Sequence, residues 1–285
     1  SDCEVILPLY RKLGVGLLEK ISGIFAFALY DIEKDEYLIA RDPVGVIPLY
    51  IGWDSDEQFY VASEQKALEG VCSTIRPFLP GHYWSSREGK MVRWYKRDWF
   101  EYDAVKDNGA DIPTLRKALE SAVKRQLMSD VPYGVLLSGG LDSSILSAVA
   151  ARAYAARNET LHTWSVDYRE NQRYFVKNSF QPTDDRDFAA MMTDFLGTHH
   201  HRVVLDPEAV CAALRPAAEA RGLPGMADVD SSLLLFCAAV KQGGTTVCLS
   251  GECADELFGG YPWYHREDIL FEDTFPWSRS VSLRL

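Results

Sequence analysis

The first part of the chain changes from a helical to a strand-like spacing of apolar residues. Residues 3–20 carry apolar side chains at helical spacing, which predicts a helix and a loop that ends at Gly23. Two runs of β-forming residues follow at 24–30 and 37–40, and the polar residues between them predict a hairpin. The further elements expected in this region are strands at 47–52 and 58–62 and a short helix at 64–68.

Beyond residue 111, helical and strand-like segments alternate. The predicted helices lie at 112–128, 143–150, 185–196, 207–220 and 229–241. The predicted strands lie at 135–137, 163–166, 201–205 and 245–249. Strict alternation is typical of a parallel sheet with helices on both faces, and such sheets bind ligands at the carboxyl ends of their strands. The fold class predicted is therefore antiparallel α+β in the first part, followed by a parallel-sheet α/β domain.

The boundary between these two parts is predicted at the polar run 106–111, which gives domains at 1–105 and 111–285. Residues 70–111 contain several Pro and Gly residues and a cluster of aromatic residues. We interpret these aromatic residues as packing side chains at the domain junction, and they are Trp94, Tyr95, Trp99, Phe100 and Tyr102.

Composition narrows the class of protein. The 285 residues have a formal net charge of −11, and no basic face stands out, which argues against a nucleic-acid partner. The six cysteines are scattered without metal-binding spacing, as in proteins of a reducing compartment. The sequence has no apolar run near the ~20 residues that span a bilayer, and its first residues do not resemble a signal peptide. We therefore expect a cytoplasmic protein without a membrane partner.

The clearest candidate for chemistry follows the predicted strand 135–137. Residues 138–144 read Ser-Gly-Gly-Leu-Asp-Ser-Ser and lead directly into a helix. Glycines let an anion approach the backbone, and the N–H groups at a helix start point towards it, so the loop predicts a phosphate site. A carboxylate at Asp142 would repel phosphate, but it fits this place if it holds Mg²⁺. The loop lacks the Gly-Lys-Ser/Thr of a Walker loop, which favours chemistry at the α-phosphate of ATP.

Two further strings connect these residues to known families. Residues 250–256 read Ser-Gly-Glu-Cys-Ala-Asp-Glu after a predicted strand, and residues 41–50 read Arg-Asp-Pro-Val-Gly-Val-Ile-Pro-Leu-Tyr. The loop at 138–144 resembles the pyrophosphate-binding loop of the ATP-pyrophosphatase group. The string at 250–256 resembles the signature of glutamine-hydrolysing asparagine synthetases. Residues 41–50 resemble a segment of class II, N-terminal-nucleophile glutamine amidotransferase domains.

The resemblance implies an ATP-dependent ligase that converts aspartate into β-aspartyl-AMP with release of pyrophosphate and then amidates it with glutamine-derived ammonia. ATP and Mg²⁺ are the implied cofactors, aspartate and glutamine are the other small-molecule partners, and many members of the family are dimers. The residues implied to contact ATP or pyrophosphate are Leu137, Ser138, Gly139, Gly140, Asp142, Ser143, Val166, Ser250 and Gly251. The resemblance also implies that Asp142 and Asp255 bind the metal, that Glu252 acts at the adenylate step, and that Asp2 binds glutamine.

The sequence departs from that family in places. The family has a nucleophilic Cys at the first residue of its amidotransferase half, whereas Ser1 stands here, so we expect no glutamine hydrolysis from this sequence. Residue 1 is not Met and no closing element precedes Leu285, which predicts a piece of a longer protein. Residues 252–255 read Glu-Cys-Ala-Asp where many members have Glu-Gly-Ser-Asp. Two alternatives stay open: a sister enzyme that adenylates another carboxylate, as β-lactam synthetases do, and a catalytically silent nucleotide-binding homologue.

Two other segments carry candidate residues. The run of histidines at 199–201 precedes a predicted strand, where neighbouring side chains alternate between faces, so we favour a structural role over a metal site. Residues 223–230 are either a part of the substrate pocket or an acidic helix start, and the sequence does not decide between them.

Overall fold

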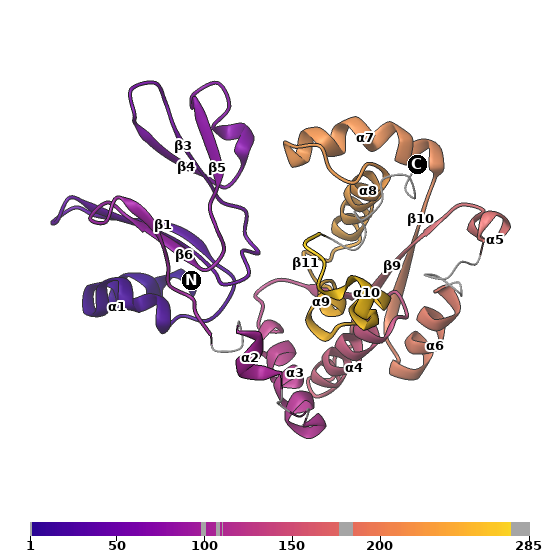
Figure 1. Ribbon diagram of the computed structural model, residues 1–285. Helices are drawn as coiled ribbons and strands as arrows, with labels where there is room; N and C mark the ends of the chain where they lie inside the picture. Colours follow the sequence, from indigo (N-terminus) through magenta and orange to yellow (C-terminus); the bar gives the residue numbers. More distant parts are fainter. Residues whose placement is uncertain (1, 98–100, 107–108, 110, 177–184, 275–285) are drawn as a thin grey trace. The chain divides into compact units, whose positions relative to one another are not determined.

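The computed structural model describes residues 2–97, 101–106, 109, 111–176 and 185–274. The chain divides into two compact units, Ser1–Gly109 and Ala110–Leu285, which are coloured along the sequence in Figure 1. The predicted limits of the two domains, at 105 and 111, stay predictions.

The first unit begins with three short helical pieces instead of the single predicted helix. These are the 3₁₀ turn η1 (Asp2–Val5), the helix α1 (Ile6–Leu13) and the 3₁₀ helix η2 (Gly14–Glu19). The break falls at Gly14, whose φ of 57° is not compatible with a continuing right-handed helix. The pieces still bury an apolar face, because Leu17 and Leu18 pack in one cluster with Leu38.

Antiparallel sheets form the rest of the first unit, as predicted. One sheet has the order β1 (Ala26–Asp31), β2 (Glu36–Arg41), β6 (His82–Ser85) and β7 (Lys90–Arg93). The other has the order β4 (Phe59–Ala62), β3 (Tyr50–Trp53) and β5 (Thr74–Pro77). The predicted hairpin is β1–β2, and the predicted helix at 64–68 is the short 3₁₀ turn η3 (Gln65–Ala67). Phe78, Ile39 and Ile51 form the buried core between the sheets.

The aromatic residues near the predicted boundary are only partly within the described residues. The Trp94 side chain packs on Phe25 and its indole N–H donates to the Arg41 carbonyl at 3.3 Å, which confirms a packing role for this residue. Trp99 and Phe100 lie outside the described residues. Tyr102 opens the short helix α2 (Tyr102–Val105).

The second unit contains a four-stranded parallel sheet. Its order is β10 (His199–Leu205), β9 (His162–Tyr168), β8 (Tyr133–Leu136) and β11 (Val247–Leu249). The longer helices around it are α3 (Ile112–Gln126), α4 (Leu141–Ala155), α6 (Arg186–Leu196), α7 (Pro207–Arg221) and α8 (Asp228–Gln242). Shorter helices are α5 (Asn171–Tyr174), α9 (Ala254–Phe258), η5 (Pro262–His265) and α10 (Glu267–Leu270). The alternation predicted from the sequence is confirmed.

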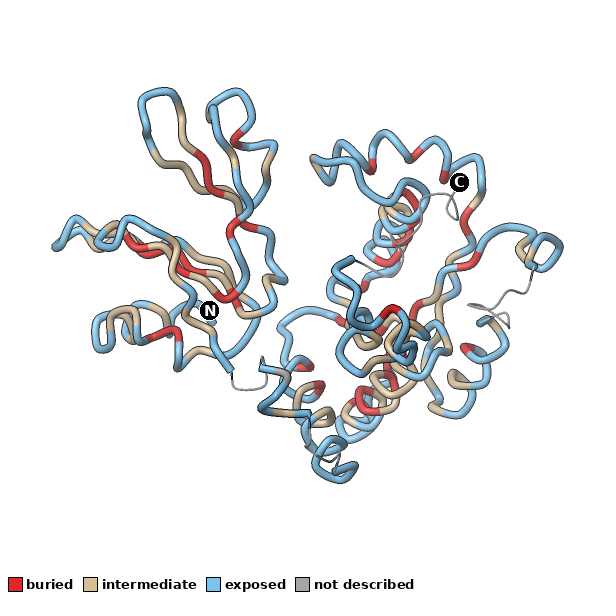
Figure 2. Tube along the Cα trace, in the orientation of Figure 1, coloured by how far each residue is buried: buried red, intermediate tan, exposed pale blue. Residues whose placement is uncertain are grey.

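Helices cover both faces of this parallel sheet. Val135 of β8 is fully buried against residues of α3 and α4, whereas the next residue, Leu136, faces the cluster of Trp164 and Phe236 on the α8 side. Figure 2 shows the buried residues gathered along the strands and the inner sides of these helices. Since neighbouring residues of a strand point to opposite faces, one short strand contributes to both cores.

The histidines at 199–201 alternate between the two faces of β10, as predicted. His200 contacts the hydroxyl groups of Thr163 and Ser165 at 3.0 and 2.9 Å, and His201 stacks on Trp164 with ring centroids 4.0 Å apart. Burial lowers the pKa of both His200 and His201, so both rings are neutral at neutral pH. Each histidine is thus accounted for by a packing or hydrogen-bonding role in the strand.

Candidate active site

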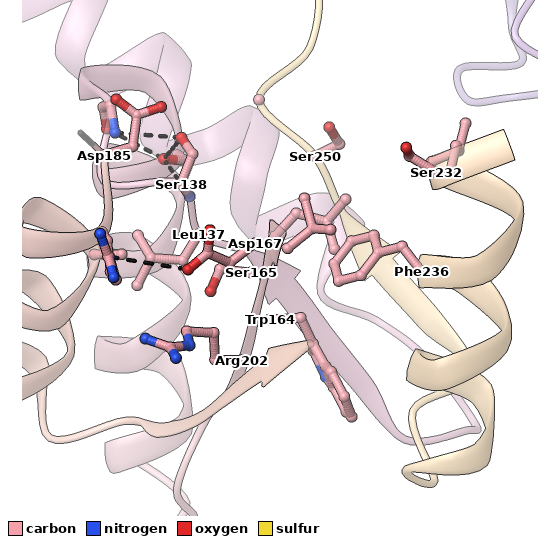
Figure 3. A pocket seen from close by; sticks show the side chains of 18 of the residues that line it. Leu137, Ser138, Trp164, Ser165, Asp167, Asp185, Arg202, Ser232, Phe236 and Ser250 are labelled. Atoms are coloured by element: carbon pink, nitrogen blue, oxygen red, sulfur yellow. Dashed lines mark hydrogen bonds and ion pairs between the residues drawn. The ribbon is translucent and has the colours of Figure 1, made fainter. Parts of the chain in front are cut away.

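A cavity of about 570 Å³ opens at the carboxyl ends of β8, β9 and β11. Figure 3 shows side chains that line it. Most of the residues predicted to bind ATP meet here: the cavity lining includes Leu137, Ser138, Gly140, Asp142, Ser143, Val166, Ser250 and Gly251, together with Glu252. Parallel strands end at one edge of the sheet, so segments that are more than 100 residues apart in sequence reach one site.

The loop after β8 is held by its own hydroxyl groups. The Ser143 hydroxyl lies 3.0 Å from that of Ser138, accepts from the Ser138 N–H at 3.3 Å and donates to the Gly140 carbonyl at 3.2 Å. Gly140 caps the long helix α4, so the unpaired N–H groups of the first helical turn start at this loop. The loop is therefore ordered by its sequence and presents backbone donors where a phosphate would bind.

Gly139 has a packing role that the sequence alone did not reveal. Its φ is 93°, and a Cβ atom at this position would lie 2.5 Å from the Ala189 backbone nitrogen in α6. Gly139 is not part of the cavity lining. The close contact with α6 is therefore the reason why this position requires glycine. From the sequence, both glycines are expected to let an anion approach the backbone.

The loop after β11 packs directly on the loop after β8. A Cβ atom on Gly251 would lie 3.1 Å from the Asp142 Cβ and 3.2 Å from the Ser143 nitrogen. Inside this second loop, the Glu252 N–H donates to the Ser250 hydroxyl at 3.2 Å. The contact brings the Glu252 region to the start of α4.

Asp142 and Asp255 interact electrostatically although Asp255 lies outside the cavity lining. Burial raises the pKa of Asp142, and the negative charge of Asp255 raises it further. Two carboxylates that repel each other in this way are stabilised when a cation lies between them. Their oxygen donors suit a hard cation, and Mg²⁺ commonly binds through one or two carboxylates plus phosphate oxygens. The described residues contain no group of three or more His, Cys, Asp or Glu side chains that could hold a metal ion.

Asp2 lies in the first unit, on the exposed turn η1. Its carboxylate accepts a hydrogen bond from the neighbouring Cys3 N–H at 3.0 Å. Its predicted contact with glutamine stays a prediction.

The cavity has further walls that the sequence analysis missed. On the α6 side, the Arg186 guanidinium lies 3.9 Å from the Asp167 carboxylate, and on the other side Tyr168 reaches Ser232 in α8. The α8 residues in the lining are Val229, Ser232, Leu233 and Phe236. A signal was present, since these positions follow a spacing of three, four and seven residues along a helix. Both interpretations left open for 223–230 hold in part. Val229 lines the cavity, and α8 begins at Asp228 with Asp230 in its first turn, where Asp230 pairs with Arg221 at 2.8 Å.

Comparison with known proteins identifies the families that match two parts of the chain. Residues 114–285 match the Asparagine synthase family, and residues 1–93 match the Glutamine amidotransferase domain. The chain belongs to the asparagine synthase family. Within the described residues, no helix of this family member is long and apolar enough to cross a membrane.

Curated relatives agree with this assignment. The chain is 46% identical over 268 residues to asparagine synthetase B (glutamine-hydrolysing) of Escherichia coli, a match that covers 93% of this chain and 48% of the relative. It is 37% identical over 316 residues to the glutamine-hydrolysing asparagine synthetase 3 of Bacillus subtilis, covering 100% of this chain and 50% of the relative. The glutamine-hydrolysing asparagine synthetase of Sandersonia aurantiaca is 37% identical over 268 residues, a match that covers 93% of this chain and 50% of the relative. The chain thus spans about half the length of these curated relatives.

Proposed function

We propose that this chain forms the ATP-binding part and a portion of the amidotransferase part of a glutamine-dependent asparagine synthetase. The observation that carries the proposal is the meeting of two Ser-Gly loops, after β8 and β11, in one cavity, where Asp142 of the lining interacts with the carboxylate of Asp255. The relatives named above are glutamine-hydrolysing asparagine synthetases, which supports aspartate, glutamine and ATP as the substrates. We also expect a cytoplasmic protein that forms homodimers and binds neither nucleic acid nor membrane.

The proposed reaction begins with an oxygen of the aspartate β-carboxylate attacking the α-phosphorus of ATP. An O–P bond forms, the bond to pyrophosphate breaks, and β-aspartyl-AMP results. Ammonia then attacks the acyl carbon, the bond to AMP breaks, and asparagine forms after loss of a proton. Leu137 and Val166 would contact the adenosine, the backbone of residues 138–143 would bind pyrophosphate, and Ser250 and Gly251 would contact ATP at the second loop.

Asp142 and Asp255 would hold Mg²⁺ with pyrophosphate, and the metal when bound offsets negative charge on the phosphates. Glu252 would position the adenylate or take a proton from the incoming ammonia.

Isotope transfer tests the proposal with the complete protein. Aspartate labelled with ¹⁸O in its β-carboxylate should pass one labelled oxygen to AMP, and pyrophosphate release should require aspartate. If labelled AMP forms only with a different carboxylic acid, that acid replaces aspartate as the proposed substrate. A protein that turns over no nucleotide at all would contradict the synthetase assignment.

A further inference from the structure

One side of the cavity is a slot between strand β9 and helix α8. Trp164, Val166 and Tyr168 alternate along β9 with other residues and so point to the α8 side of the sheet. Val229, Leu233 and Phe236 of α8 face them across the cavity, and Phe236 packs against Trp164. The two walls are apolar and carry no charged side chain among these six residues.

A single hydrogen bond joins the two walls at the open end of the slot. The Tyr168 hydroxyl donates to the Ser232 hydroxyl oxygen at 2.9 Å, across 64 positions of sequence. Ser232 is only 7% exposed, whereas Tyr168 is 39% exposed, so the bond ties a residue at the cavity mouth to a buried point of α8. Among the described residues of β9 and α8, it is the one side-chain hydrogen bond that connects the two elements.

The proposed function places the adenosine of ATP against Val166, which lies in this slot. We propose that Tyr168 and Ser232 form a clamp that sets the width of the slot. The inference rests on the proposed function, because that function requires the nucleotide whose base the clamp would hold. A flat aromatic base fits between two apolar walls. Dispersion contacts with both walls need close separation, since a gap of about 0.5–1 Å already loses a quarter to a half of the attraction. Tyr168 and Ser232 are positioning residues, because they act through the walls that contact the base.

The test compares Tyr168→Phe, Ser232→Ala and the double variant in the complete protein. Each single change removes one partner of the bond and little else. We expect each to raise the KM for ATP about threefold to tenfold, the range that a single neutral hydrogen bond supplies. The KM for aspartate and kcat should stay within about twofold, and the double variant should be no worse than either single variant because the two residues act as one unit.

Tyr154→Phe is the matched control. It also removes a tyrosine hydroxyl, one that donates to the Tyr133 carbonyl at 3.0 Å in the core of the same unit, away from the cavity. It should lower the Tm and leave the KM for ATP unchanged. The clamp is refuted if Tyr168→Phe and Ser232→Ala behave like this control, or if their effects on the KM simply multiply.

The affinity for ATP, measured by calorimetry, separates the two proposals. If the wild-type protein binds ATP but shows no aspartate-dependent pyrophosphate release, the proposed reaction fails and the clamp is judged from the Kd of the same variants. If the wild-type protein is active and the variants keep the wild-type KM and Kd for ATP, the clamp alone is wrong. A protein that does not bind ATP contradicts both.

Discussion

The two Ser-Gly loops of the second unit follow neighbouring parallel strands, yet they are built differently. The loop after β8 is tied by the hydroxyls of Ser138 and Ser143 and continues into a helix of 15 residues. The loop after β11 has the hydrogen bond between Ser250 and Glu252, then places Cys253 in a left-handed conformation before a helix of five residues. The first loop is therefore ordered by its own contacts, and the second depends more on its neighbours.

This difference separates two tasks of the proposed site. A pyrophosphate site gains from fixed backbone donors, because donors that are already in place need no reorganisation when charge develops. The second loop carries the side chains that would act on the acyl group. The predictions below test the two loops in turn, beginning with the largest expected effect.

Asp142→Ala should lower aspartate-dependent pyrophosphate release by about 10²- to 10³-fold, the range seen when one charge-stabilising group is removed from an active site. Steady-state assays at saturating Mg²⁺ measure this. Asp194→Ala, which removes an exposed carboxylate on α6, is the control and should keep wild-type rates. Wild-type turnover by Asp142→Ala would rule out the metal-binding role.

Glu252→Gln should reduce asparagine formation by about 10²-fold while the Kd for ATP changes little, since the change removes charge and keeps shape. Product analysis and calorimetry measure the two quantities. A loss of the cooperative unfolding transition in this variant would instead assign Glu252 a structural role.

Gly139→Ala should lower the free energy of unfolding by about 3 kcal/mol, because it adds a Cβ atom at a positive φ and against the α6 backbone. Urea denaturation measures this value. Gly140→Ala is the matched change in the same loop, where φ is −64° and the nearest atom to a Cβ lies 3.4 Å away. It should cost less than about 1 kcal/mol, and equal losses in both variants would remove the distinction between the two glycines.

Cys253→Gly should raise the free energy of unfolding by about 0.5–1 kcal/mol, because Cys253 has a φ of 69°. Cys211→Gly, in the exposed part of α7, should do the opposite and destabilise by about 1 kcal/mol. A loss of stability in both variants would show that the second loop is not strained at Cys253.

The sequence predicted the order of strands and helices in the second unit because apolar spacing and strand–loop–helix transitions are local properties. It predicted the two loops for the same reason. The sequence did not predict the walls of the cavity, because the hydrogen bond between Tyr168 and Ser232 joins residues that are far apart in the chain. The glycine break inside 3–20 was also missed, since apolar spacing continues through Gly14 although the backbone does not. Local patterns thus predicted residues that line one cavity, and tertiary contacts decided the shape of that cavity.

The fluorescence of Trp164 can report on the state of the second unit. The indole is 4% exposed, lines the cavity and donates to the Thr245 hydroxyl at 3.0 Å. Its ring is stacked on His201, and a protonated imidazole quenches indole fluorescence. Since the pKa of His201 is lowered, the emission of Trp164 should stay bright at neutral pH and fade only in acid. A nucleotide in the slot that Trp164 lines would change the same emission, so nucleotide binding could be followed without any added label.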